Sequence, residues 1–157
     1  MLNQRIVSVF AVRAITPTRL PNSDTIKQTP LDDMAGEFPR FDERRAGLSY
    51  RHGYFAADTS DTGKVIFNGI AHIDMQTGKR TLHAFPPGDV PGEPVFVPRA
   101  ANSGEGDGWL IALVYRGAEN RSDFVVFDAS DIAKGPIGVA HLPKRVPFGF
   151  HGNWRAA

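Results

Sequence analysis

Histidine is the residue type in this chain that is best suited to chemistry, because neutral imidazole is a common ligand for iron and zinc. The chain has five histidines and no cysteine. The lack of cysteine excludes disulfides, thiolate zinc sites and iron–sulfur clusters, which leaves His, Asp and Glu as metal ligands. None of the histidines is paired at the spacing of metal ligands on a helix. They are His52, His72, His83, His141 and His151.

His151 has the most unusual sequence context of the five. It stands between glycines and bulky aromatic residues in the run Phe-Gly-Phe-His-Gly-Asn-Trp, which covers residues 148–154. Glycines let the backbone come close to a bound group, and aromatic side chains keep water away from it. From the residues alone, both a metal ligand and an ordinary histidine fit this context.

Two glutamates, Glu37 and Glu93, each lie in an apolar stretch bounded by proline. A carboxylate that is buried in such a stretch requires a partner to offset its desolvation. One suitable partner is a metal-bound imidazole, whose second ring nitrogen donates its proton to the carboxylate. The other is a salt bridge to Arg40 or Arg99. The sequence leaves both readings open.

The elements that position these residues are predicted to be β-strands. The apolar runs are short, rich in Val, Ile and Phe, and separated by Gly, Pro, Asp and Asn, and no segment has a helical apolar stripe. His72 and His83 fall on predicted strands, as does His141, and we interpret these three as ordinary strand histidines. The clearest runs are residues 65–73, 80–85, 93–97, 109–115, 123–127 and 137–142.

The connections between the runs suggest an antiparallel arrangement. Gly78, in the link 74–79, can adopt the positive φ of a tight turn, which predicts a hairpin. The last three runs follow one another with short polar links, as in one blade of a propeller or in a meander. Residues 24–58 contain two prolines and a charged cluster, so we expect extended loops with few regular strands there.

Size and composition favour a single soluble domain. The chain has 157 residues, of which 41% are hydrophobic, and a net charge of +1 from 18 basic and 17 acidic residues. Because the charges of both signs are interspersed, nucleic acid is not an expected partner. The apolar run at residues 6–12 is too short to be a transmembrane segment. We therefore expect a cytoplasmic protein.

Several motifs, taken in order and spacing, resemble the end of the carotenoid cleavage oxygenases. They are Gly-Glu-Pro-Val-Phe-Val-Pro-Arg at 92–99, Asp-Gly-Trp-Leu at 107–110, Val-Phe-Asp-Ala at 126–129 and Leu-Pro-Lys-Arg-Val-Pro-Phe-Gly-Phe-His-Gly at 142–152. Upstream, residues 26–54, with Gly-Glu-Phe-Pro-Arg at 36–40, resemble the bacterial branch that includes the lignostilbene dioxygenases. The resemblance covers residues 22–154.

This resemblance implies an all-β fold, a seven-bladed β-propeller that holds one Fe(II) on its axis with four histidines. By its place in the motif, His151 matches the last iron ligand, while Glu37 and Glu93 match glutamates that support ligand histidines. Phe148 and Phe150 flank the implied ligand and become candidates for the substrate tunnel. The implied reaction uses O₂ to cleave a carbon–carbon double bond of a carotenoid, apocarotenoid or stilbene into two carbonyl products.

Length is the main departure from the family pattern. A blade takes about 40 residues, so this chain supplies about three blades and cannot close a ring of seven. We therefore expect residues 23–157 to form the C-terminal blades of a partial propeller, with long loops, and residues 1–22 to be an unassigned junction segment. The other four histidines do not stand in the ligand motifs of the family. A chain of this kind would be inactive alone and would associate through its open blade edges.

Two further interpretations remain at this point. In the first, the chain is a non-catalytic β-sheet interaction module, or the remnant of a split gene, that binds a partner through its exposed edges. A small hydrolase or another metal enzyme that uses the five histidines is the third reading, although no spaced ligand pair supports it. Propeller blades encoded directly upstream would favour the oxygenase.

Overall fold

β-Strands form nearly all of the regular structure, as the short Val-, Ile- and Phe-rich runs predicted. The computed structural model describes residues 15–19, 26–30, 32–60 and 66–156. Within these ranges the helical elements are two short 3-10 helices, η1 and η2, and neither has the length or apolar character to cross a bilayer. The strands are β1 (Ile15–Arg19), β2 (Ile26–Pro30), β3 (Gly36–Phe41), β4 (His52–Ala57), β5 (Gly69–Asp74), β6 (Arg80–Ala84), β7 (Val90–Pro91), β8 (Val95–Pro98), β9 (Gly108–Arg116), β10 (Arg121–Asp128) and β11 (Gly138–His141), with η1 at Glu43–Arg45 and η2 at Ile132–Lys134.

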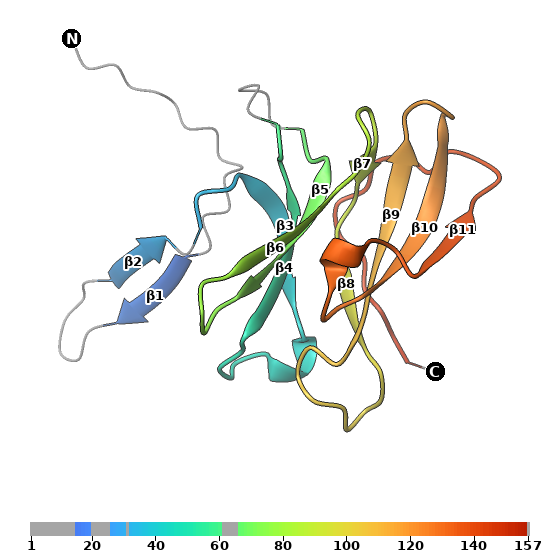
Figure 1. The fold of residues 1–157 in the computed structure, drawn as a ribbon. Helices are drawn as coiled ribbons and strands as arrows, with labels where there is room; N and C mark the ends of the chain where they lie inside the picture. The colour runs from blue at the N-terminus through green and yellow to red at the C-terminus, as the bar shows by residue number, and fades with distance from the viewer. Residues whose placement is uncertain (1–14, 20–25, 31, 61–65, 157) are drawn as a thin grey trace, which may run out of the picture.

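The strands form three antiparallel sheets (Figure 1). β1 pairs with β2, and β3, β4, β5 and β6 form a four-stranded sheet in sequence order. The predicted hairpin is confirmed: β5 and β6 are adjacent, and Gly78 in their link has a φ of 70°. In the third sheet β9 pairs with β10 and β10 with β11, while both β7 and β8 pair with β9. The predicted succession of three strands is therefore also confirmed.

The prediction of few strands in residues 24–58 is wrong, because β2, β3 and β4 lie there. β4 was missed because almost every side chain along it is buried, so apolar and polar residues do not alternate. In β3 the register shifts between Glu37 and Arg40, and this bulge accommodates Pro39 inside the strand. The expected junction at residue 22 and the first residue of the expected strand 65–73 lie outside the described residues.

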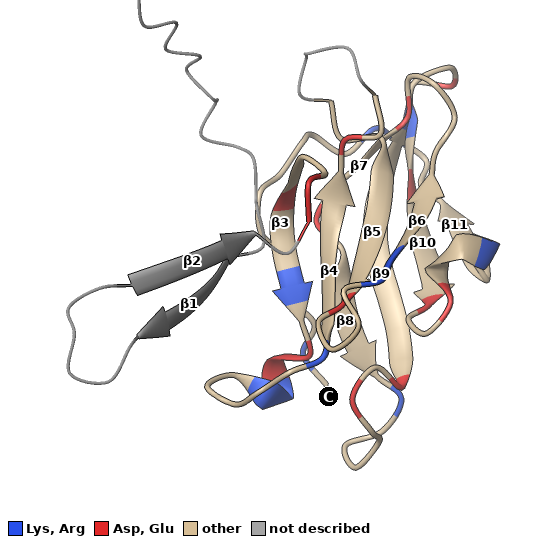
Figure 2. Cartoon of the chain, turned by 60° about the vertical axis from the view of Figure 1, so that its left-hand side comes forward, with Lys and Arg blue, Asp and Glu red and all other residues tan. Residues whose placement is uncertain are grey.

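The core lies between the two larger sheets. Tyr54 and Ile70 from one sheet contact a cluster that includes Leu110 and Phe127 from the other, and all four side chains are buried. Ile132 of η2 closes this cluster. Charged residues lie mainly in loops and at strand ends (Figure 2), which leaves the strand centres to apolar side chains. Apolar burial on this scale fixes the two sheets against each other.

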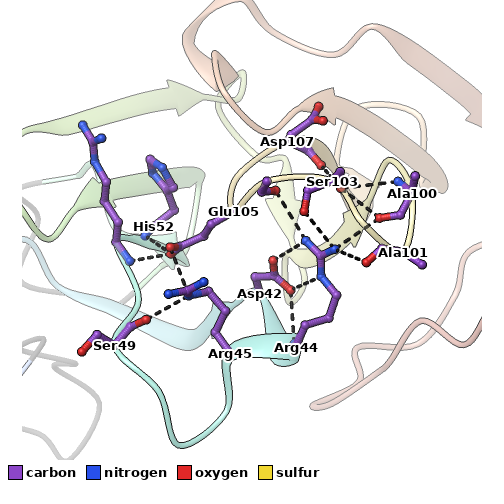
Figure 3. Close-up of polar contacts among 12 residues, drawn as sticks. Asp42, Arg44, Arg45, Ser49, His52, Ala100, Ala101, Ser103, Glu105 and Asp107 are labelled. Carbon is purple, nitrogen blue, oxygen red and sulfur yellow. Dashed lines mark hydrogen bonds and ion pairs between the residues drawn. The ribbon is translucent and has the colours of Figure 1, made fainter.

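At one end of the molecule, Arg44 joins the two sheets (Figure 3). Its guanidinium group donates hydrogen bonds to the Asp42 carboxylate, with the shortest at 2.6 Å, and to backbone carbonyls of the loop between β8 and β9. Burial acts to raise the pKa of Asp42, but the hydrogen bonds from Arg44 outweigh it and lower that pKa. Glu105 in the same loop accepts from the backbone N–H of His52 at 3.0 Å. This end of the fold is therefore held by side chains as well as by the core.

Two leucines on β9 test where the core lies. Leu110 is fully buried, whereas Leu113 on the opposite face is 40% exposed. Leu110→Ala leaves a cavity and is expected to lower the free energy of unfolding by about 2–5 kcal/mol, while Leu113→Ala should lower it by about 1 kcal/mol at most. Urea unfolding followed by tryptophan fluorescence gives both values. Equal losses in the two variants would contradict the assigned core.

Candidate metal centre

His151 and Glu93 meet at the start of β8. The Glu93 side chain is only 5% exposed, and its Oε1 lies 3.1 Å from Nδ1 of His151. Its Oε2 accepts a hydrogen bond of 2.7 Å from the backbone N–H of Gly152. The His151 side chain, by contrast, is 72% exposed. A buried carboxylate therefore holds one edge of an imidazole whose other edge is open.

This contact determines how the His151 ring is oriented. An ionised carboxylate only accepts hydrogen bonds, so Nδ1 of His151 must be the donor. In the neutral ring Nε2 then carries a free lone pair, which is the form that binds a metal ion. Carboxylate support of this kind is the usual arrangement behind a ligating histidine.

Glu93 also makes the salt bridge that the sequence left as an alternative. Its partner is Arg40 on β3, with Nη1 lying 3.3 Å from Oε1 of Glu93. Arg99, the nearer arginine in sequence, instead pairs with Asp107 at 2.7 Å. The Glu93 carboxylate thus contacts both an imidazole and an arginine, and the arginine comes from a distant part of the chain.

Phe38 is a residue of this region that the sequence analysis missed. It has a φ of 56° in the bulge of β3, and the edge of its ring meets the His151 ring, with 5.8 Å between the centroids. A bulky residue at positive φ costs of order 1–3 kcal/mol and persists only where surrounding contacts impose it. Pro39 is the sequence signal that could have indicated an irregular strand here, although it was interpreted as a sign of a loop.

His151 and Glu93 border a largely apolar hollow of about 590 Å³. This is the size of a typical small-molecule site. The tunnel candidates Phe148 and Phe150 line it and are 61% and 78% exposed. The ring of Phe148 packs edge-on against Tyr115, with 5.7 Å between centroids. The remaining apolar lining includes Phe38, Phe67, Ile111, Leu113 and Phe124.

Glu37 is placed differently from Glu93. It lies half-buried on β3, opposite Ala56 of β4, and its carboxylate makes no hydrogen bond or ion pair with the residues that the structure describes. Its predicted role as a carboxylate behind another ligand histidine therefore stays a prediction.

The remaining histidines lie away from His151. His52 and His72 face each other on β4 and β5, with 2.9 Å between Nδ1 and Nε2. His83 packs against Phe85 and Phe127, and burial lowers its pKa. His141 lies on β11 with its Nδ1 at 2.9 Å from the Asp123 carboxylate. His72, His83 and His141 are on strands, as predicted.

Across the described ranges of the chain, no three His, Asp or Glu side chains come together in a way that could hold a metal ion. His151 fits one position of a metal site, because its Nε2 is free while its Nδ1 is held. In the described ranges, His151 is the histidine whose ring both borders the apolar hollow and lies against a buried carboxylate.

Comparison with known proteins identifies the family of this chain. Residues 11–156 match the family described as RPE65, retinal pigment epithelial membrane protein. The apocarotenoid-15,15'-oxygenase of Synechocystis sp. is 34% identical, covering 85% of this chain and 27% of that protein. The lignostilbene-alpha,beta-dioxygenase isozyme III of Sphingomonas paucimobilis is 42% identical, covering 87% of this chain and 30% of that protein.

The fold agrees as well. The crystal structure of cobalt-substituted Synechocystis ACO superimposes with a TM-score of 0.80 at 34% sequence identity, covering 85% of this chain and 28% of that one. The chain therefore belongs to the family of RPE65 and the carotenoid cleavage oxygenases, as its motifs indicated. It spans less than a third of the length of the Synechocystis and Sphingomonas enzymes.

The buried His72 gives a prediction for the pH dependence of stability. Burial, followed by the nearby His52, lowers the pKa of His72 to about 4, from an ordinary value of 6.5. Between these values the unfolded chain takes up a proton that the folded chain does not. The contribution of His72 to the free energy of unfolding should therefore be fully present above pH 6.5. It should decrease as the pH falls toward 4, by up to about 3 kcal/mol.

His72→Gln should flatten this part of the stability profile, while Thr81→Val should preserve it. Thr81 contacts His72 Nδ1 at 3.3 Å, so the control removes a hydrogen bond and leaves the buried imidazole. Urea midpoints measured across this pH range provide the comparison. A profile as steep for His72→Gln as for the wild type would assign the acid sensitivity to other groups.

Proposed function

We propose that these residues form the C-terminal part of a non-haem Fe(II) dioxygenase that cleaves a carbon–carbon double bond of a carotenoid, apocarotenoid or stilbene. The observation that carries the proposal is the His151–Glu93 pair, which presents an oriented imidazole at the edge of a large apolar hollow. Family membership supports the same reaction class.

The order of the strands supports a partial propeller. β3 to β6 and β8 to β11 are each four antiparallel strands in which successive strands pair, which is the pattern of a propeller blade. The first strands of the two meanders, β3 and β8, lie in contact. Glu37 lies on β3 and Glu93 two residues before β8, so both glutamates are near the first strand of a meander. Blades arranged around one axis would bring such positions together.

Each residue of the region has a distinct proposed role. His151 donates one nitrogen to the iron, Glu93 holds that ring in place, and Glu37 supports a ligand histidine contributed from outside these residues. Phe38, Phe148 and Phe150 keep water away and contact the apolar substrate. The bound Fe(II) supplies activation of O₂.

The hollow suits an apolar substrate. Its lining is mostly aromatic and aliphatic, while Glu93 and His151 place polar atoms at one side. The relatives are named for apocarotenoid and lignostilbene substrates. The resemblance of residues 26–54 to the lignostilbene branch favours a stilbene-type substrate among the three.

A second role, association through a sheet edge, is supported by β11. In the described residues β11 pairs on one side only, with β10. Val139 on this strand is 45% exposed, and Ile137 directly before it is 62% exposed. An open strand edge with apolar side chains favours pairing with further blades or with another chain.

The iron content of a chimera tests the proposal. After anaerobic reconstitution with Fe(II), the isolated chain should hold no stoichiometric iron, because one histidine is too few ligands. Placed in the apocarotenoid-15,15'-oxygenase of Synechocystis in place of the corresponding segment, it should restore both iron and alkene cleavage. Elemental analysis and product chromatography give the two readouts.

His151→Ala in that chimera should remove both iron and cleavage. His141→Ala is the matched control, because His141 lies on β11 with Asp123 as its partner. A chimera that keeps full iron and full cleavage without His151 would refute the role given to this residue.

A further inference from the structure

Arg40 connects three separate parts of the fold. Its side chain is 14% exposed, and its Nη1 lies 3.3 Å from Oε1 of Glu93. Its Nη2 donates to Glu43, the first residue of η1, at 2.6 Å, and to Oδ1 of Asn153 at 3.1 Å. Asn153 in turn donates to Glu43 at 3.1 Å. One guanidinium group thereby links β3, the segment that leads into β8 and the C-terminal segment.

The contact with Glu93 is the important one, because the same oxygen receives the proton of His151. Both Nη1 of Arg40 and Nδ1 of His151 approach Oε1 of Glu93. The other oxygen, Oε2, is occupied by the backbone N–H of Gly152. With both oxygens engaged, the carboxylate cannot turn away from the imidazole.

Arg40 is also the only Lys or Arg side chain within ion-pair distance of Glu93 in the part of the chain that the structure describes. A carboxylate that is only 5% exposed is costly without a cation, and the planar guanidinium group fixes geometry as well as charge. The Nε atom of Arg40 is buried without a hydrogen-bond partner among these residues. The position of the side chain is thus set by its two terminal nitrogens.

We propose that Arg40 is a positioning residue for His151. By fixing the carboxylate of Glu93, it holds His151 as the tautomer with the proton on Nδ1 and the lone pair on Nε2. The importance of this tautomer rests on the proposed function of His151 as an iron ligand. Because the His151 ring is 72% exposed, the Glu93 carboxylate is its main polar restraint.

The competing explanation is that Arg40 merely tethers the C-terminal segment. Asn153 separates the two explanations, because its side chain forms hydrogen bonds with Arg40 and Glu43 but none with Glu93. Asn153→Ala weakens the tether and leaves the Arg40–Glu93 contact. Arg40→Met keeps the apolar stem and removes the contact itself.

Nitrogen NMR of the full chain, labelled with ¹⁵N at histidine and free of iron, measures the tautomer directly. The pH is kept well above the ordinary histidine pKa, and the His151 signal is assigned by its loss in His151→Ala. In Arg40→Met the ratio of the Nδ1–H to the Nε2–H form of His151 should fall about ten-fold, as for loss of a charge-assisted hydrogen bond. Asn153→Ala should keep the wild-type ratio.

Arg40→Lys retains a charge on a flexible stem, and it replaces Arg40→Met in this measurement if Arg40→Met does not fold. Lysine cannot hold Glu93 and Asn153 in one planar geometry, so the ratio should fall here too, although less. An unchanged ratio in either folded variant would overturn the proposal, as would an equal fall in Asn153→Ala. Because no iron is present, this outcome is independent of whether His151 binds iron in a complete site.

Discussion

The structure around the candidate centre depends on one buried charge, the carboxylate of Glu93. A carboxylate that is only 5% exposed carries a large desolvation cost unless it is fully paired. Its partners are a guanidinium group from β3 and an imidazole and a backbone N–H from the C-terminal segment. Satisfying this one group therefore brings together parts of the chain that are far apart in sequence. The orientation of His151 follows from it.

The two larger sheets provide the rigid frame for that charge. Their shared apolar core holds β3 and β8 in contact, so Arg40 and Glu93 reach each other without long flexible links. The Arg44 contacts hold the loop between β8 and β9 at one end of the fold. The bulge in β3 turns the Phe38 ring toward His151. Local irregularity at the site is thus supported by regular structure elsewhere.

The sequence correctly predicted the strands that have a recognisable local pattern of residues. Short apolar runs identified β5, β6, β8, β9, β10 and β11, and the unusual contexts of His151 and Glu93 singled out both residues. It failed at β4, whose continuous burial removes the alternation of a half-buried strand, and at β3, which contains Pro39. The Arg40–Glu93 pair joins residues 53 positions apart. Such a contact arises from tertiary packing and leaves no local pattern.

The position of the metal relative to His151 tests the role of this residue most directly. A crystal structure of the iron-loaded chimera with the Synechocystis apocarotenoid-15,15'-oxygenase, with anomalous data collected at the iron edge, would locate it. We expect an iron peak at bonding distance from Nε2 of His151, with Nδ1 still on the Glu93 carboxylate. A peak that does not touch His151, or one bound through Nδ1 with Glu93 displaced, would be incompatible with the role given to this pair.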